Sequence, residues 1–97
     1  LLLNRANKVI GVYEASAGGL TGTVADPRLI LAAAIKSLAV SIVLSHNHPS
    51  GNLKPSRADE ELTQKIKCAA AYHDIRVIDH IIITSEGYYS FANEGLL

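Results

Sequence analysis

The sequence predicts an α/β domain in which a mixed β-sheet is flanked by two helices, one on each face, and a β-hairpin ends the chain. Two segments carry apolar residues at helical spacing, and short segments rich in Val, Ile and Leu alternate with them. The last two apolar segments are separated only by Ser85-Glu86-Gly87, which is typical of a hairpin turn. Read along the chain, the predicted order is β-β-β-α-β-α-β-β.

Length and composition are those of a single globular domain, which we place at residues 1–97. The chain has 97 residues, of which 48% are hydrophobic and 19% are charged, enough for an apolar core. It begins Leu1-Leu2-Leu3 without a methionine, so we expect it to be part of a longer protein.

Three short strands are expected in the first quarter of the chain. Residues 1–3 form the first strand, residues 4–7 turn the chain, and residues 8–14 form the second strand. Residues 20–24 form the third strand, after a loop of small residues.

A helix is expected to begin at Asp26-Pro27, because Asp caps helix N-termini and Pro is tolerated at the first helical position. Residues 39–45 follow as a strand that is apolar on both faces, as in a central strand. The buried face of the helix is predicted from its apolar residues: Ile30, Leu31, Ala34, Ile35 and Leu38.

A second helix is expected over residues 57–73, after a loop that Pro and Gly keep irregular at residues 47–55. Residues 75–84 then form a buried strand rich in Ile, and residues 88–91 complete the terminal hairpin. The apolar stripe of the second helix consists of Ala58, Leu62, Ile66, Ala69, Ala70 and His73.

The residues with the clearest chemical meaning are His46, His48 and Asp59. The two histidines end an apolar strand, and the aspartate opens the next helix. Two imidazoles and one carboxylate are the protein ligands of many hydrolytic zinc ions, whose fourth position is left to water. This pattern predicts a metal site.

Each of these residues also has an ordinary structural explanation. Ser56 and Asp59 have the spacing of a capping box, and a single histidine at a strand end is usually a surface or core residue. Residues i and i+2 of an extended segment point the same way, however, so His46 and His48 face one spot. Asp59 shares the buried face of its helix, where a carboxylate needs a cation or hydrogen-bond donors. The joint interpretation as a metal site is therefore favoured.

These residues resemble a known motif. His46-x-His48-x(7)-Ser56-x-x-Asp59 matches the JAMM motif of the JAB/MPN+ zinc metallopeptidases. The segment Ser-His-Asn-His-Pro-Ser-Gly, and Asp-Ile-Arg-Val-Ile-Asp-His at residues 74–80, are similar to the bacterial RadC-like branch, a family that carries a DNA-repair label. The resemblance covers essentially the whole chain and implies a cytidine-deaminase-like α/β/α fold.

The resemblance also implies a chemistry. Zinc (Zn²⁺) would be held by His46, His48 and Asp59, with water as the fourth ligand. Glu14 matches the glutamate that acts on this water as general base, although an exposed strand carboxylate is its alternative interpretation. Ser56 would donate to the developing oxyanion. The implied substrate is a peptide or isopeptide bond.

Other titratable residues receive structural interpretations. His80 alternates with Ile78 and Ile82 and is expected to face a packed layer as a core histidine. Asp79 then points to the opposite face, where it orients a neighbour or reaches the surface. His73 ends the second helix, and Cys68 is expected to be structural.

Composition narrows the possible partners. Nine basic and nine acidic residues leave no net charge, so we expect no direct nucleic-acid binding by this domain. A single cysteine excludes the Cys-x-x-Cys chemistry of zinc deaminases and indicates a reducing, cytoplasmic setting, and the apolar runs are too short to span a membrane. The alternative to a hydrolase is a metal-stabilised interaction module, without peptidase turnover, within a DNA-repair-associated protein.

Overall fold

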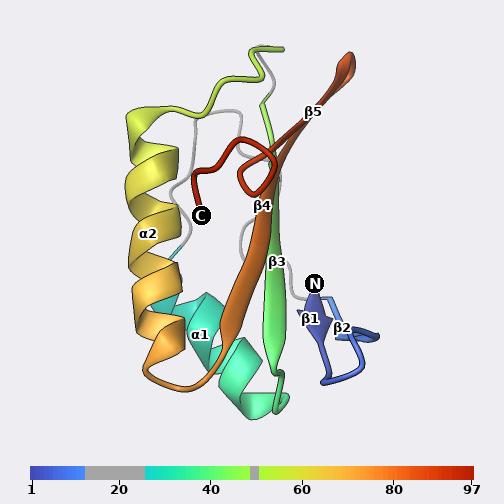
Figure 1. The fold of residues 1–97 in the computed structure, drawn as a ribbon, viewed down its shortest axis with the longest axis vertical. Coiled ribbons are helices and arrows are strands. Elements are labelled where there is room, and N and C mark those ends of the chain that lie inside the picture. The colour runs from blue at the N-terminus through green and yellow to red at the C-terminus, as the bar shows by residue number, and fades with distance from the viewer. Residues whose placement is uncertain (13–25, 49–50) are drawn as a thin grey trace.

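A five-stranded mixed sheet of order β2-β1-β3-β4-β5 organises the computed structural model, which describes residues 1–12, 26–48 and 51–97 (Figure 1). β3 and β4 pair in parallel, and the other neighbouring strands pair antiparallel. The predicted mixed sheet and terminal hairpin are confirmed, whereas the strand predicted at residues 20–24 lies outside the described residues. The strands are β1 (Leu2–Leu3), β2 (Val9–Gly11), β3 (Ser41–Asn47), β4 (Arg76–Thr84) and β5 (Gly87–Ser90).

The two helices begin where the sequence predicts. In α1 (Pro27–Lys36), the Asp26 carboxylate accepts a hydrogen bond from the backbone N–H of Arg28 at 2.9 Å. In α2 (Arg57–Ala71), Ser56 is the N-cap. Within the described part of the chain, neither helix is long and apolar enough to cross a bilayer.

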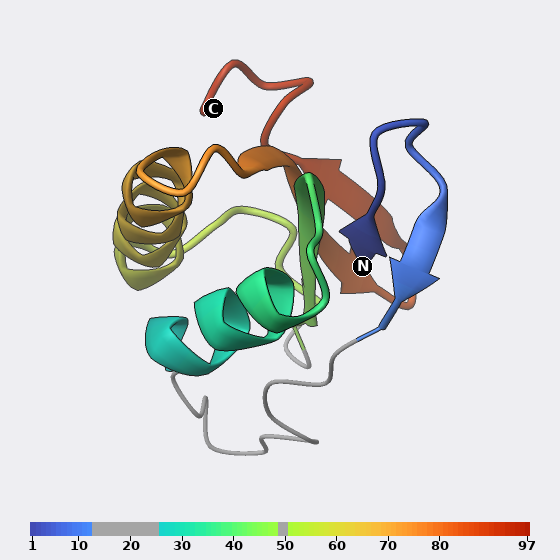
Figure 2. The ribbon, with the colours of Figure 1, turned by 90° about the horizontal axis from the view of Figure 1, so that it is seen from below.

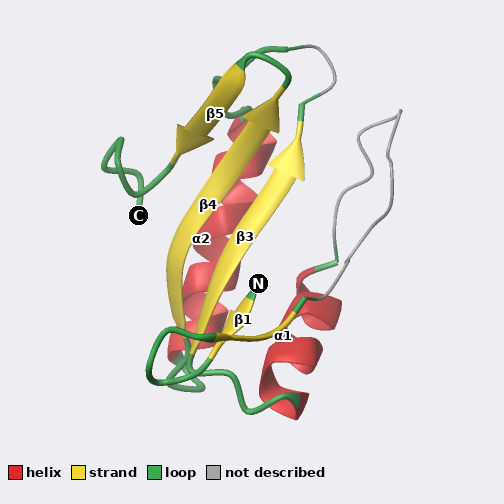
Figure 3. Ribbon diagram, turned by 90° about the vertical axis from the view of Figure 1, so that its right-hand side faces the viewer, coloured by secondary structure: helices red, strands yellow, loops and turns green. Residues whose placement is uncertain are grey.

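Both helices cover the same face of the sheet, so the prediction of one helix on each face is wrong for the described residues. Ala34 of α1 and Ile66 and Ala70 of α2 belong to one buried cluster with Ile42 of β3. Figure 2 shows the two helices side by side on one side of β3, and Figure 3 looks onto the other face, with α2 behind β3 and β4. The apolar sides of both helices therefore pack on the same face of the sheet, to which β1, β3 and β4 contribute side chains.

Parts of the predicted apolar stripes are exposed. α1 ends at Lys36, and Leu38 lies beyond it with a φ of 57° and an exposed fraction of 83%. Ile35 is 44% exposed. Of the stripe predicted for the second helix, Ala58 is exposed in the first turn of α2, and His73 is exposed beyond its end at Ala71. The stripes predicted from helical spacing are therefore longer than the parts of the two helices that contact the sheet.

Candidate metal centre

The carboxyl end of β3 and the first turn of α2 bring the predicted ligands together. Ile42 and Leu44 face the core beneath the helices, so His46, two residues further along β3, points the same way. His48 follows directly after the strand, and Asp59 is the third residue of α2. The end of β3 and the start of α2 lie at the same end of the molecule in Figure 1.

The three side chains converge on one point. Nε2 of His46 lies 2.8 Å from Nε2 of His48 and 3.3 Å from Oδ1 of Asp59. Nε2 of His48 lies 3.1 Å from Oδ2 of Asp59. One ligand atom from each residue lies within 4.8 Å of the others. The sequence-based triad is therefore a spatial cluster.

The cluster has the donor set and nearly the spacing of a zinc site. Zinc bonds of ~2.0–2.1 Å in a tetrahedron place neighbouring ligand atoms ~3.3 Å apart. The two histidine–aspartate separations match this edge, and the two imidazoles lie about half an ångström closer than it. A small opening between the imidazoles is enough to admit the ion.

His48 is held in the tautomer that a metal requires. Its Nδ1 lies 2.7 Å from the backbone carbonyl oxygen of Asn52. Because a carbonyl only accepts hydrogen bonds, Nδ1 carries a proton, which leaves Nε2 as the atom that can ligate a metal. Asn52 was not identified from the sequence, since its backbone gives no motif.

The electrostatics also favour a metal-competent protonation state. Partial burial opposes ionisation of Asp59, but hydrogen bonds from Ser56 and the charges of His46 and His48 outweigh it, so the pKa of the carboxyl lies below its usual value. Burial lowers the pKa of His46, against the opposing effect of Asp59. An ionised carboxylate and a neutral imidazole are the forms that ligate metal.

Ser56 combines two properties that were predicted separately. Its Oγ accepts from the backbone N–H of Asp59 at 3.0 Å, and the Asp59 carboxylate accepts from the backbone N–H of Ser56 at 2.7 Å. The predicted capping box is confirmed. The capping bond uses a lone pair of the hydroxyl and leaves its proton available for a second acceptor. The other predicted catalytic residue, Glu14, lies outside the described residues.

His80 lies behind the triad as a satisfied core histidine, as expected. It is 3% exposed, and its ring stacks on Phe91 with centroids 4.6 Å apart. Its Nε2 lies 2.8 Å from Nδ1 of His46, and its Nδ1 hydrogen-bonds with Oγ1 of Thr63. Burial, followed by the charge of His46, lowers the pKa of His80 to about 4, so the ring is neutral at pH 7.

Acidification is expected to destabilise the metal-free protein as the pH falls from 6.5 to about 4. The unfolded chain takes up a proton at His80 in this window and the folded protein does not, so the free energy of unfolding falls by up to about 3 kcal/mol. Urea unfolding followed by circular dichroism, with chelator present, measures this. A His80→Gln variant should show a flatter pH profile, and an unchanged profile would assign the effect to other groups.

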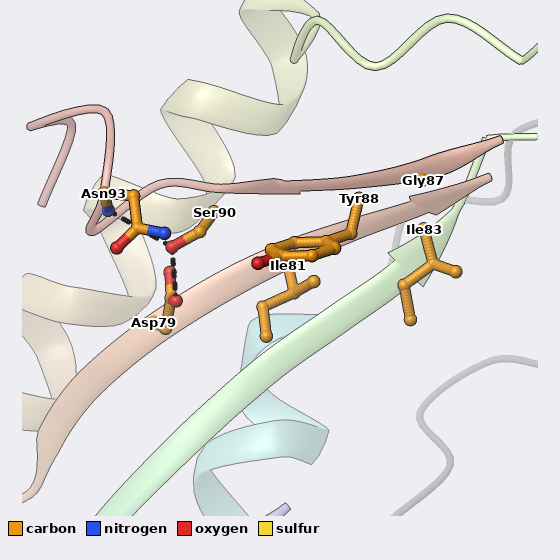
Figure 4. Close-up of a pocket in the computed structure, with 7 residues that line it drawn as sticks. All are labelled: Asp79, Ile81, Ile83, Gly87, Tyr88, Ser90 and Asn93. Atoms are coloured by element: carbon orange, nitrogen blue, oxygen red, sulfur yellow. Dashed lines mark hydrogen bonds between the residues drawn. The ribbon is translucent and has the colours of Figure 1, made fainter.

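Asp79 serves the opposite face of the sheet. Its carboxylate accepts from the backbone N–H groups of His80 at 2.7 Å and Ala92 at 3.0 Å, and from Oγ of Ser90 at 2.6 Å. Figure 4 shows it at one end of a hollow over β4 and β5. The expectation that Asp79 faces away from His80 is confirmed. Its hydrogen bonds with Ser90 and Ala92 attach the segment after β5 to β4. The hollow is lined by Asp79, Ile81, Ile83, Gly87, Tyr88, Ser90 and Asn93.

Comparisons with known proteins agree with the motif. The family model of the RadC-like JAB domain matches residues 1–96. The chain is 47% identical over 96 residues to a "UPF0758 protein" of Flavobacterium johnsoniae, covering 99% of this chain and 42% of that one. It is 49% identical over 98 residues to a protein of the same name from Porphyromonas gingivalis, covering 100% of this chain and 43% of that one. The chain thus spans about two fifths of the length of these curated relatives.

Proposed function

We propose, since the chain belongs to the RadC-like JAB domain family, that it is a zinc-dependent hydrolase of the metallopeptidase or isopeptidase type. The observation that carries this proposal is the convergence of His46, His48 and Asp59 on one point. Two neutral imidazoles and one carboxylate supply three ligands and leave the fourth position of a tetrahedral ion to water, as hydrolytic zinc sites require.

Within this proposal, each residue has a defined task. Bound zinc supplies Lewis-acid chemistry and lowers the pKa of its water to ~7. The Glu14 carboxylate accepts the proton of the attacking water and delivers it to the leaving amine. The Ser56 hydroxyl donates to the oxygen of the scissile carbonyl as negative charge develops there, because its proton is not used by the capping box.

Metal analysis and a substrate screen test the proposal together. The purified protein should contain one zinc per chain, and a His46→Ala/His48→Ala double variant should contain none. Linear and isopeptide-linked peptide libraries should be cleaved only by the zinc-loaded protein, and chelator should abolish the cleavage. Absence of zinc in the wild-type protein, after incubation with the metal, would contradict the proposal.

Replacing Ser56 tests its two properties separately. Ser56→Ala is expected to lower the free energy of unfolding by about 1 kcal/mol, because the helix cap is lost. Ser56→Gly should lower it by only about a few tenths of a kcal/mol. Both variants lack the hydroxyl, so turnover should fall by ~10²-fold in each. If the turnover of Ser56→Gly stayed close to that of the wild type and only Ser56→Ala lost turnover, Ser56 would act only as a helix cap.

A cytoplasmic location belongs to the same proposal. Cys68 is an exposed free thiol, which a reducing compartment preserves.

A further inference from the structure

A chain of hydrogen bonds joins the two elements that supply the metal ligands. It runs from Nδ1 of His46 on β3 to Nε2 of His80 on β4 at 2.8 Å, and from Nδ1 of His80 to Oγ1 of Thr63 on α2. It ends with Oγ1 of Thr63 donating to the backbone carbonyl oxygen of Asp59 at 2.7 Å. Thr63 is fully buried, and His80 nearly so. The chain therefore connects one ligand to the backbone of another through the protein interior.

The direction of every proton in this chain follows from its last member. A carbonyl oxygen only accepts, so the single hydroxyl proton of Thr63 is committed to Asp59. Thr63 must then accept from His80, which places the His80 proton on Nδ1 and leaves Nε2 as an acceptor. His46 must therefore donate from Nδ1, which leaves its Nε2 as the atom that can ligate a metal.

We propose that Thr63 and His80 are positioning residues that hold His46 in the tautomer able to bind the metal. This inference deepens the proposed hydrolase, on whose metal site it rests. With Nδ1 of His46 held by the relay and Nδ1 of His48 held by the Asn52 carbonyl, both rings direct their Nε2 atoms to the same point. The two Nε2 atoms lie 2.8 Å apart, so the ion would displace the proton between them and separate the rings slightly, while both Nδ1 protons stay in place.

The relay also differs from the usual support of a metal-bound histidine, which is a carboxylate, a backbone carbonyl or a water. Here the acceptor is a neutral imidazole whose plane is set by stacking on Phe91, with the two rings inclined by only 16°. An imidazole accepts at Nε2 only while Nδ1 keeps its proton, so its function depends on the Thr63 hydroxyl. A histidine that only filled space would not need this hydroxyl.

Thr63 offers a matched pair of variants. Thr63→Val preserves shape and removes the hydroxyl, whereas Thr63→Ser retains the hydroxyl and loses a methyl group. His80→Phe preserves the stacked ring and removes both nitrogens. Two properties should be measured: the tautomer of His46 in zinc-free protein, from imidazole nitrogen chemical shifts at a pH above the titration range of histidine, and the dissociation constant for zinc. Thermal unfolding of each zinc-free variant shows whether it is folded.

In wild type and Thr63→Ser, the His46 proton should reside on Nδ1 and zinc affinity should be similar. In Thr63→Val the His46 tautomer should shift toward a proton on Nε2. In both Thr63→Val and His80→Phe, zinc affinity should fall by ~10–100-fold, the usual effect of losing an outer hydrogen-bond partner. An unchanged tautomer in Thr63→Val, or equal losses of affinity in Thr63→Val and Thr63→Ser, would overturn the relay. Because the tautomer is read without metal, a wild-type protein that binds no zinc would refute the proposed function and leave the relay to be judged on this measurement.

Discussion

Asp59→Asn is expected to lower zinc affinity by more than ~100-fold, which exceeds the effect of losing an outer hydrogen-bond partner. The substituted amide keeps the size of the side chain and an oxygen that can accept from the backbone of Ser56. It removes the negative charge that the ion requires beside two neutral imidazoles. Competition with a chromophoric chelator measures the dissociation constant, and unfolding of the zinc-free variant shows whether α2 remains capped.

The matched control for Asp59→Asn is His73→Ala. His73 is an exposed potential ligand that lies beyond the end of α2. Its removal should leave zinc stoichiometry and affinity unchanged. Full zinc affinity in Asp59→Asn, or a larger loss in His80→Phe than in Asp59→Asn, would show that the ligand assignment is wrong.

Glu14→Gln is expected to reduce turnover by ~10²–10⁴-fold while zinc content stays at the wild-type level. Glutamine preserves size and hydrogen bonding but cannot take the proton of the attacking water. A base that acts on water has no need to ligate the ion, so metal binding and catalysis should separate in this variant. Elemental analysis and cleavage of the best substrate from the peptide screen give the two measurements.

Glu86→Gln is a suitable control, because Glu86 is an exposed carboxylate in the turn between β4 and β5. It should cleave substrate at the wild-type rate. Chelator-sensitive activity that survives in Glu14→Gln would place the general base elsewhere. A protein with full zinc occupancy and no turnover on any peptide would favour the interaction module without peptidase activity.

The ligand triad could be predicted from the sequence because each of its determinants is local. Alternation along β3 places His46 on the core face, and the Ser56-x-x-Asp59 spacing specifies the cap that presents the carboxylate. Local capping signals also predicted correctly that α1 begins at Pro27.

The errors concern tertiary placement. A periodic apolar stripe shows that a helix buries one side, but it does not show which face of the sheet receives it, and α1 and α2 share one face. The support of His46 was missed because it depends on α2 packing against β4, which brings Thr63 to His80. One signal was available: a threonine four residues after Asp59 can return a hydrogen bond to the Asp59 carbonyl.

The carboxylate of Asp79 links the C-terminal segment to the candidate metal centre on the other side of the sheet. Asp79 anchors Ser90 and Ala92, and between these two lies Phe91, whose ring supports His80. A fused tag, a proteolytic cut or a docked partner at residues 91–97 would therefore act next to the ring that hydrogen-bonds with His46. The C-terminal segment thus contacts the support of the candidate metal centre and none of its predicted ligands.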